Sequence, residues 1–302
     1  MKFTVVIPLY NKSRHIIETV NTVLAQQYPA DEIIVVDDGS SDGGAELLEA
    51  QNIASLVVIR QKNAGVSAAR NVGIAAARHN FVALLDADDL WSPLFLAEIA
   101  RSISEKPGAG LYATSYQMMD GDDHYSDAVV RGLSSSSDIR LMNNYFSVAA
   151  SGDLPFITSS VCMNRRALGG KFVFPEREPM GEDQDLWSQI ALFSTIVYSP
   201  RVLVMYVRCA DNRACVNAPP KEECPFSMRL YKYAQGPEID AELRDDILKY
   251  CGSHLISIAK LNIYSGDLSR ARAILQDARC WRKPFHKVWW SLIRWIYLVR
   301  SC

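Results

Sequence analysis

The stretch from Phe81 to Asp89 is an apolar run of strand length that ends in three carboxylates, Asp86, Asp88 and Asp89. A continuous apolar run of this length is typical of a strand that is buried on both faces of a sheet. In an open α/β sheet, ligands bind at the carboxyl ends of such strands. Clustered carboxylates repel one another, and Mg²⁺ or Mn²⁺ would relieve that repulsion, because these hard cations prefer oxygen ligands and bridge carboxylates to phosphates. The alternative is a solvated turn that opens the next helix.

Three more apolar runs precede this strand, at 3–9, 33–36 and 56–59. Between the runs, an amphipathic pattern that begins near Ser13 and a second segment at 66–78 predict helices. Strands that alternate with helices at this spacing indicate βαβ units and a parallel sheet. The sequence therefore predicts a doubly wound α/β domain.

Four short motifs stand at the ends of these strands: VIPLYN at 6–11, IVVDDGS at 34–40, NAGVSAARNVGI at 63–74 and LDADD at 85–89. In this order and spacing they resemble the family 2 glycosyltransferases of the GT-A fold. The resemblance implies a Rossmann-like, mostly parallel sheet flanked by helices. It also implies a nucleoside-diphosphate sugar donor, with a UDP-sugar expected, a divalent metal (Mn²⁺ or Mg²⁺), and transfer of the sugar to an acceptor hydroxyl with inversion.

The resemblance places six residues on the nucleotide sugar: Pro8, Tyr10, Asp38, Arg70, Asp86 and Asp88. Tyr10 offers an aromatic face to the nucleobase, with edge packing as its structural alternative. Either Asp37 or Asp38 can accept the N–H of a base; the family pattern favours Asp38, and an Asx turn is the alternative role for one of the two. The planar guanidinium of Arg70 suits a diphosphate, against the default of an exposed helix arginine.

Asp86 and Asp88 match the DxD element of the family. By that resemblance Asp88 is the direct metal ligand, and Asp86 contacts the ribose or a metal-bound water. Asp89 is expected to cap the helix that begins near Pro93.

The segment 205–213 departs from the family pattern because it contains no histidine that could help to hold the metal. Arg208 or Arg213 is the expected replacement, since a cation there would neutralise a leaving diphosphate. Cys209 is a poor candidate ligand because hard cations prefer oxygen. The sequence therefore supports donor binding more strongly than metal dependence.

A second acidic cluster, MGEDQDLW at 180–187, stands at the start of a predicted helix. An acceptor hydroxyl is a poor nucleophile until a base removes its proton, and a helix N-terminus favours an ionised carboxylate and fixes its direction. By resemblance to the ED motif of the family, Asp183 is the catalytic base, and Glu182 orients it or contacts the acceptor. Asp185 is expected to support the start of the helix. The alternative is a set of acids that only complement the helix dipole.

Residues 1–220 are predicted to form the catalytic domain, with a nucleotide-sugar-binding half at 1–105 and an acceptor-binding half at 106–220. The pattern loosens in the acceptor half, where strands are expected at 111–118 and 156–163 with loop composition between them. The remaining residues, from 221 to 302, are predicted to be an α-helical C-terminal extension.

The tail at 281–302 combines aromatic and basic residues and contains no acid. These residues are Trp281, Arg282, Lys283, Lys287, Trp289, Trp290, Arg294, Trp295, Tyr297 and Arg300. Such a composition is typical of an amphipathic helix at a membrane interface, and anionic lipids attract it. We expect the tail to dock on the inner face of the cell membrane, which would suit a lipid-linked acceptor; packing as a final core helix is the alternative.

Composition narrows the choice of partners and compartment. The formal net charge of -2 argues against a dedicated nucleic-acid-binding protein. The seven cysteines form no CxxC pair and no disulfide framework, which fits a reducing compartment. The first apolar run is too short for the core of a signal peptide. We therefore expect a cytoplasmic protein.

These expectations describe an inverting, metal-assisted glycosyltransferase that acts on a saccharide or lipid-linked acceptor in polysaccharide or glycolipid assembly. Two other function classes stay open. A nucleotidyltransferase would need a glycine-rich phosphate loop after the first strand, and residues 8–12 contain no glycine. A catalytically idle binding or scaffold member would keep the donor motifs, although the intact Asp38, Asp88 and Asp183 speak against it.

Overall fold

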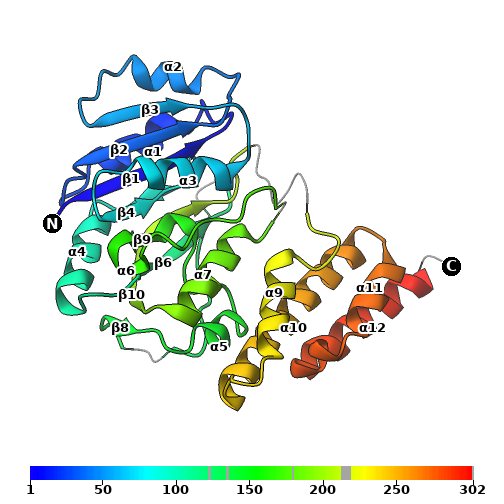
Figure 1. Ribbon diagram of the computed structural model, residues 1–302. Helices are drawn as coiled ribbons and strands as arrows, with labels where there is room; N and C mark the ends of the chain where they lie inside the picture. Colours follow the sequence, from blue (N-terminus) through cyan, green and yellow to red (C-terminus); the bar gives the residue numbers. More distant parts are fainter. Residues whose placement is uncertain (122–123, 134–135, 179, 212–218, 301–302) are drawn as a thin grey trace.

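The computed structural model describes residues 1–302 with the exception of 122–123, 134–135, 179, 212–218 and 301–302. Within the described residues, ten strands form one mixed sheet with helices on both faces (Figure 1). The strands are β1 (Phe3–Leu9), β2 (Glu32–Asp37), β3 (Leu56–Arg60), β4 (Phe81–Leu84), β5 (Leu90–Trp91), β6 (Leu111–Met119), β7 (Tyr125–Asp127), β8 (Arg140–Leu141), β9 (Val161–Asn164) and β10 (Ile196–Val207).

The helices of the sheet domain are α1 (Ile16–Leu24), α2 (Gly44–Glu49), α3 (Val66–Ala76), α4 (Phe95–Glu105), α5 (Tyr145–Ala149), η1 (Thr158–Ser160), α6 (Arg165–Leu168) and α7 (Glu182–Phe193). The C-terminal helices are α9 (Pro225–Ala234), α10 (Ala241–Tyr264), α11 (Leu268–Leu275), η2 (Ala278–Arg282) and α12 (Pro284–Arg300).

Four parallel strands in the order β3-β2-β1-β4 confirm the predicted βαβ units. Val6 of β1 pairs with Ile34 of β2 on one side and with Leu84 of β4 on the other. Beyond β4 the sheet is mixed, because β9 runs antiparallel to both β4 and β6 whereas β10 runs parallel to β6. The strand order reverses between β1 and β4, which is the switch point where open α/β sheets bind their ligands.

Alternate side chains of the central strands fill two apolar cores, one on each face of the sheet. Val5 and Ile7 of β1 pack with residues of α1, α2 and α4. Val6 and Leu84 pack on the opposite face with residues of α3, α5 and α7. Gly73 lets α3 approach β1 closely, since a Cβ at this position would lie 2.3 Å from Cγ1 of Val6. This approach fixes α3 over the end of β1.

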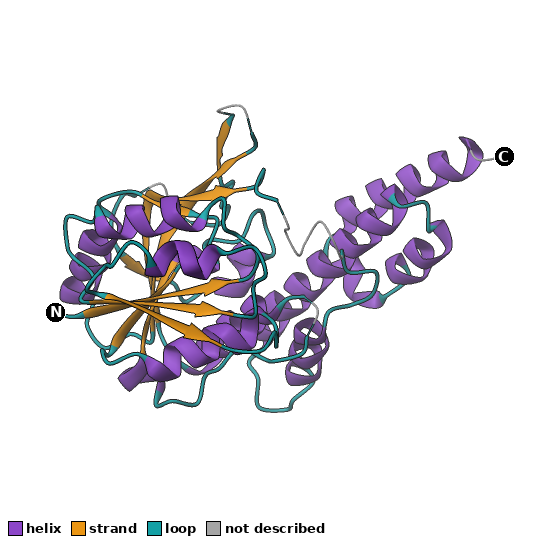
Figure 2. Ribbon diagram, turned by 90° about the horizontal axis from the view of Figure 1, so that it is seen from above, coloured by secondary structure: helices purple, strands orange, loops and turns teal. Residues whose placement is uncertain are grey.

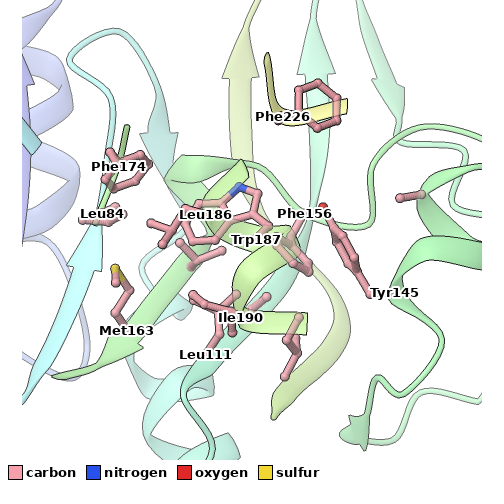
Figure 3. Close-up of a cluster of buried hydrophobic side chains, with 14 of the residues drawn as sticks. Leu84, Leu111, Tyr145, Phe156, Met163, Phe174, Leu186, Trp187, Ile190 and Phe226 are labelled. Carbon is pink, nitrogen blue, oxygen red and sulfur yellow. The ribbon is translucent and has the colours of Figure 1, made fainter. Parts of the chain in front are cut away.

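The buried Trp187 anchors α7 in the second core (Figure 3). Its indole meets the rings of Phe156 and Phe174 edge to face, with centroids 5.9 and 5.8 Å away. Aromatic pairs of this geometry stabilise a core beyond the area that they bury. Because Trp187 is held from both sides, the first turn of α7, which carries Glu182 and Asp183, has a defined position.

The C-terminal helices project away from the sheet (Figure 2). Helix α10 nevertheless joins the core of the sheet domain, since Ile247, Tyr250 and Cys251 are buried in the cluster that contains Trp187. Helix α12 packs against α10 and α11. The predicted helical extension is therefore confirmed. In the described part of the chain, no helix is both long enough and apolar enough to cross a bilayer.

The expected strand at 156–163 is only partly correct. The strand β9 begins at Val161, and residues Thr158–Ser160 form the 3₁₀ turn η1. The Oγ of Ser160 accepts a hydrogen bond from the backbone N–H of Ile157, 3.0 Å away, and this local bond replaces a ladder bond. The turn presents Ser159 to the end of β4.

Candidate active site at the carboxyl ends of the strands

Three of the predicted donor-site segments meet where the parallel strands end. Tyr10 follows β1, Asp38 follows β2, and Asp86 and Asp88 follow β4. Because β2, β1 and β4 are neighbours that run in the same direction, their carboxyl ends share one edge of the sheet. Tyr10 is 44% exposed, so its side chain is accessible to a nucleobase.

Arg70 connects the strand-end acids to the acids of α7. Its guanidinium donates one hydrogen bond to Oδ1 of Asp86 at 2.8 Å and another to Oε1 of Glu182 at 3.0 Å. The side chain is buried and lies over the ring of Phe174, with 5.1 Å from Cζ to the ring centroid. Burial alone would lower the pKa of Arg70, but the carboxylates of Asp86 and Glu182 raise it above its usual value. The exposed-arginine alternative is therefore wrong.

The Nε atom of Arg70 is buried and has no hydrogen-bond partner among the described residues. A buried donor without a partner costs stability, commonly about 1–3 kcal/mol, and such sites often serve a ligand. Each terminal nitrogen of the guanidinium donates one hydrogen bond to a carboxylate, and the two carboxylates were predicted to serve different halves of the reaction. Arg70 thus joins the donor motif and the base motif in one ion network.

Asp183 lies in the first turn of α7, directly after the Glu182 that pairs with Arg70. Its Oδ1 accepts the backbone N–H of Gln184 at 2.7 Å. Burial, together with the nearby Glu182, raises the pKa of Asp183 to about 7, although Arg70 acts in the opposite direction. A carboxyl group with a pKa near the working pH is well suited to accept a proton from an acceptor hydroxyl.

Asp88 carries an internal counter-charge that the sequence did not predict. The Nζ of Lys12 donates to its Oδ2 at 2.7 Å, and both side chains are largely buried. Lys12 also donates to the backbone carbonyl of Asp211. Lys12 is the second residue after Tyr10, so its nearness to the donor motif was the one signal in the sequence that could have found it.

A divalent cation at Asp88 must take most of its ligands from elsewhere. Among the described residues no three acidic, histidine or cysteine side chains converge on one point. Asp86 turns to Arg70, and Asp89 is buried against Ser159 and β10. Mg²⁺ in proteins is commonly bound by one or two carboxylates, substrate phosphates and water. Asp88 fits that kind of site. In this structure, the ammonium group of Lys12 is the cation beside its Oδ2.

Asp38 is fully engaged by its own chain. Its carboxylate accepts hydrogen bonds from Gln61 Nε2 at 2.7 Å and from the backbone N–H groups of Ala64 and Gly65 at 2.8 and 2.9 Å. Asp38 thus shapes the loop that leads to α3 and Arg70, and its contact with a base stays a prediction. Asp37 bonds within its own turn, although not as the Asx turn that we expected, since its Oδ1 accepts the N–H of Ser40, three residues on, at 2.9 Å.

Pro8 lies inside β1 opposite Val36 and is buried. Its predicted contact with the donor stays a prediction. Arg208 pairs with Asp120, with 3.0 Å between Nε and Oδ1. Arg213, the other arginine that we expected near the diphosphate, lies outside the described residues.

Asp89 does not cap the next helix, so that prediction is wrong. The residue before α4 is Leu94, and no side chain caps this helix. Asp89 instead shares hydrogen bonds with Oγ of Ser159 at 2.5 Å and with the backbone N–H of Val207 at 3.0 Å. Burial, with Asp88 and Asp86 as further causes, raises its pKa strongly. Its bond to Val207 connects β10 to the strand-end motif.

Asp185 points away from the site. Its carboxylate pairs with Arg229 of α9 at 2.7 Å and accepts Nε2 of Gln189 at 2.6 Å. The neighbouring Gln184 accepts the hydroxyl of Tyr250 at 2.9 Å. Both contacts attach α7 to the C-terminal helices. Sequence reasoning missed them because they join segments that are far apart in the chain.

The comparisons with known proteins agree with this architecture. The model of the family "Glycosyl transferase family 2" matches residues 4–168. An uncharacterized glycosyltransferase of Rickettsia felis is 31% identical over 196 residues, which are 65% of this chain and 31% of the relative. An uncharacterized glycosyltransferase of Nostoc sp. is 36% identical over 143 residues, 46% of this chain and 44% of the relative. The chain thus spans less than half the length of these relatives.

Two solved structures share the fold. S. aureus TarS 1–349, in complex with UDP-GlcNAc, superposes with a TM-score of 0.67 at 19% identity, over 98% of this chain and 91% of that one. The Pyrobaculum calidifontis mannosyltransferase PcManGT, in complex with GDP-Man and Mn²⁺, has a TM-score of 0.58 at 18% identity, over 99% and 85% of the two chains. These likenesses confirm the predicted α/β fold with its helical extension. Since the family model covers more than half of the 302 residues, the chain belongs to glycosyl transferase family 2.

Proposed function

We propose that this chain transfers a sugar from a nucleoside-diphosphate sugar to an acceptor hydroxyl, with Asp183 as general base and inversion at the anomeric carbon. One observation carries the proposal above the others. Arg70 binds Asp86 of the donor motif and Glu182 beside the base, so the two predicted halves of the reaction share one ion network.

The donor binds at the strand edge in this proposal. Tyr10 stacks on the nucleobase, and Arg70 faces the diphosphate through the part of its fork that Asp86 and Glu182 leave free. TarS and PcManGT, which were solved with UDP-GlcNAc and GDP-Man, support a nucleotide-sugar donor, and we expect a UDP-sugar. Asp88 would hold a divalent cation, Mn²⁺ or Mg²⁺, that neutralises the negative charge of the departing diphosphate. The Mn²⁺ bound by PcManGT supports that assignment.

In this proposal, Asp183 activates the acceptor hydroxyl. Its carboxylate takes the proton of the acceptor hydroxyl while the hydroxyl oxygen bonds to the anomeric carbon, and the bond from that carbon to the diphosphate oxygen breaks. Arg70 favours the ionised form of Asp183, because its positive charge offsets part of the burial that raises the pKa to about 7. Glu182, held by Arg70, fixes the direction from which the acceptor approaches.

We further propose that the protein works at the inner face of the cell membrane, in polysaccharide or glycolipid assembly, with residues 281–302 toward the lipid. The exposed aromatic side chains of α12 support this placement, since Trp289 and Trp295 are 61% and 58% exposed. The acceptor is then a saccharide or a lipid-linked saccharide.

The test is turnover of a panel of nucleotide sugars with and without Mn²⁺, by the wild type and by Asp183→Asn. Release of the nucleoside diphosphate that needs Asp183 supports transfer. Binding of a nucleotide sugar without any turnover would instead favour a scaffold role, for which the Lys12–Asp88 pair gives a specific reason, because Lys12 already neutralises the predicted metal ligand.

A further inference from the structure

Two connected cavities lie beside the C-terminal helices, away from the strand edge. They measure about 690 and about 540 Å³ and share four lining residues, Ser253, Lys260, Lys283 and His286. The first runs between α10 and α12, and the second reaches Arg131 and Asp153 of the sheet domain. We call the two together the basic groove.

The basic groove has an excess of positive charge. Within the described chain, Arg131, Lys260 and Lys283 have no carboxylate partner. The pKa of Lys283 is lowered by burial and by the nearby cations Lys249 and Arg131. The acid that lines the groove, Asp153, accepts the backbone N–H of Val129 at 2.8 Å. An anion in the groove would relieve the repulsion between these cations.

Lys260 lines the groove beside two aromatic rings. Its Nζ lies 5.5 Å from the ring centroid of Trp290 and 5.9 Å from that of Tyr264. Trp290 and Tyr264 in turn meet edge to face at 5.7 Å, which fastens α12 to α10. These aromatic contacts hold the ammonium group in place and do not neutralise its charge.

The rim of the groove on α12 is apolar and exposed. Phe285, Trp289, Leu292 and Ile296 recur about once per helical turn and are 88, 61, 53 and 43% exposed. Lys287 lies on the other side of the helix, buried with its Nζ 3.6 Å from the ring centroid of Trp281. The apolar stripe is therefore not used for packing within the described chain.

We propose that the basic groove binds the phosphate of an anionic phospholipid headgroup while the stripe from Phe285 to Ile296 enters the acyl region of the same leaflet. A phospholipid surface presents an anion next to hydrocarbon, which is the arrangement of cations and apolar side chains seen here. The occupant is a membrane rather than a nucleic acid, because the stripe beside the cations carries no charged group and the whole chain has a net charge of -2.

This site deepens the proposed membrane contact of residues 281–302 and rests on it. It also gives the contact an orientation. Helix α10 lines the groove with Ser253 and Lys260, and one turn earlier its Tyr250 bonds to Gln184, the residue after Asp183. A membrane bound at the groove therefore lies on the side of the molecule from which α10 reaches the catalytic base.

Sedimentation of the full chain with vesicles tests the site. The two preparations are pure phosphatidylcholine and phosphatidylcholine with phosphatidylglycerol, at constant ionic strength. The variants are Lys260→Ala with Lys283→Ala, and Phe285→Ser with Trp289→Ser. Matched controls remove exposed residues elsewhere: Lys2→Ala with Lys171→Ala, and Leu47→Ser on α2. Each variant is also followed by thermal unfolding, so that a folding defect is seen separately.

We expect binding to the anionic vesicles and little to the neutral ones. Loss of the two lysines should weaken binding to the anionic vesicles about 25-fold, because each cation near a charged surface contributes about fivefold to the affinity. The aromatic double variant should lose binding to a similar degree, and the controls should bind like the wild type. Binding that survives in the lysine variant, or that inorganic phosphate displaces fully, overturns the headgroup site. Absence of binding to either vesicle overturns the membrane contact as well, and leaves the transfer reaction at Asp183 untouched.

Discussion

The strand edge and the basic groove handle charge in opposite ways. At the strand edge the two buried cations have carboxylate partners, since Arg70 pairs with Asp86 and Glu182, and Lys12 pairs with Asp88. In the groove, Lys260 and Lys283 have no acidic partner within the described residues. The first region is organised before any ligand arrives. In the second, our proposal assigns the missing negative charge to a phospholipid headgroup.

The difference has a physical cause. Arg70 is buried, with its side chain only 5% exposed, so it requires compensating charges nearby. Lys260 is exposed, and water can solvate it until a ligand comes. Substitutions at the strand edge should therefore change both stability and chemistry, whereas those in the groove should change association alone.

The largest expected effect is that of Asp183→Asn on transfer. Loss of a general base commonly slows a reaction about 10²–10⁴-fold, and we expect a loss in this range at saturating donor. Binding of the nucleotide should remain, as measured by thermal stabilisation.

Asp185→Asn is the matched control, because this acid lies in the same turn of α7 but pairs with Arg229. It should lower the melting temperature and retain most of the transfer rate. Equal losses of activity in the two variants would remove the distinction between Asp183 and its neighbour.

Arg70→Met should destabilise the fold by about 3 kcal/mol, because removal of one partner leaves buried carboxylates unpaired. It should also raise the pKa of Asp183 further, since Arg70 now lowers it. Denaturant unfolding measures the first effect. A variant as stable as the wild type would show that the network does not hold the strand edge together.

Lys12→Ala should increase the affinity for Mn²⁺ about tenfold, which corresponds to about 1.4 kcal/mol for the removal of a competing cation. Calorimetric titration of the protein with Mn²⁺ measures this without turnover, and Lys12→Ala with Asp88→Ala is the control that should abolish the gain. If the affinity falls in Lys12→Ala, Lys12 helps to bind the metal and does not compete with it.

Tyr250→Phe has the smallest expected effect. It removes the hydrogen bond to Gln184 and should cost about 1 kcal/mol of stability, as a typical single hydrogen bond does. Vesicle binding should not change, because the groove keeps its cations. A loss of vesicle binding would show that the two regions are coupled through α10 more tightly than the contacts indicate.

The strand-end motifs could be predicted because local sequence determines them. An apolar run that ends in Asp86 and Asp88 predicts both the strand and the position of its carboxyl end. Arg70 and Asp183 followed from the family resemblance, and the structure brings them to the same network. The helical extension was also predicted from the sequence, and Ile247, Cys251 and Ile258 of α10 are all buried.

What the sequence did not predict depends on contacts between distant segments. Lys12 meets Asp88 across 76 positions, and Asp89 meets Val207 across 118. The prediction for Asp89 relied on the usual preference of aspartate for a helix start. Asp89 instead accepts the backbone N–H of Val207 in β10, because a buried N–H at the end of that strand needs an acceptor. The basic groove has lining residues from four parts of the chain, so only the fold could assemble it.

The pH dependence of the transfer rate is the most direct test of the central claim, that the acid of the ion network with a pKa of about 7 is the catalytic base. Because Asp183 must be ionised to accept a proton, the rate at saturating substrates should fall below neutral pH with one ionisation near pH 7. The raised pKa of Asp183 also predicts how the stability of the fold changes with pH. Its pKa is higher in the folded protein than the usual 3.8, so it stabilises the fold at low pH, and this contribution is lost as pH rises from about 4 to about 7.

The measurement is the rate profile of the wild type from acid to alkaline pH, with melting temperatures of the wild type and of Asp183→Asn recorded at each pH. Our account predicts an acid limb near pH 7 in the wild type. It also predicts that the melting temperature of Asp183→Asn exceeds that of the wild type at alkaline pH. A rate that stays level down to the usual pKa of an exposed aspartate would contradict it, because Asp183 would then not be the group that takes the proton.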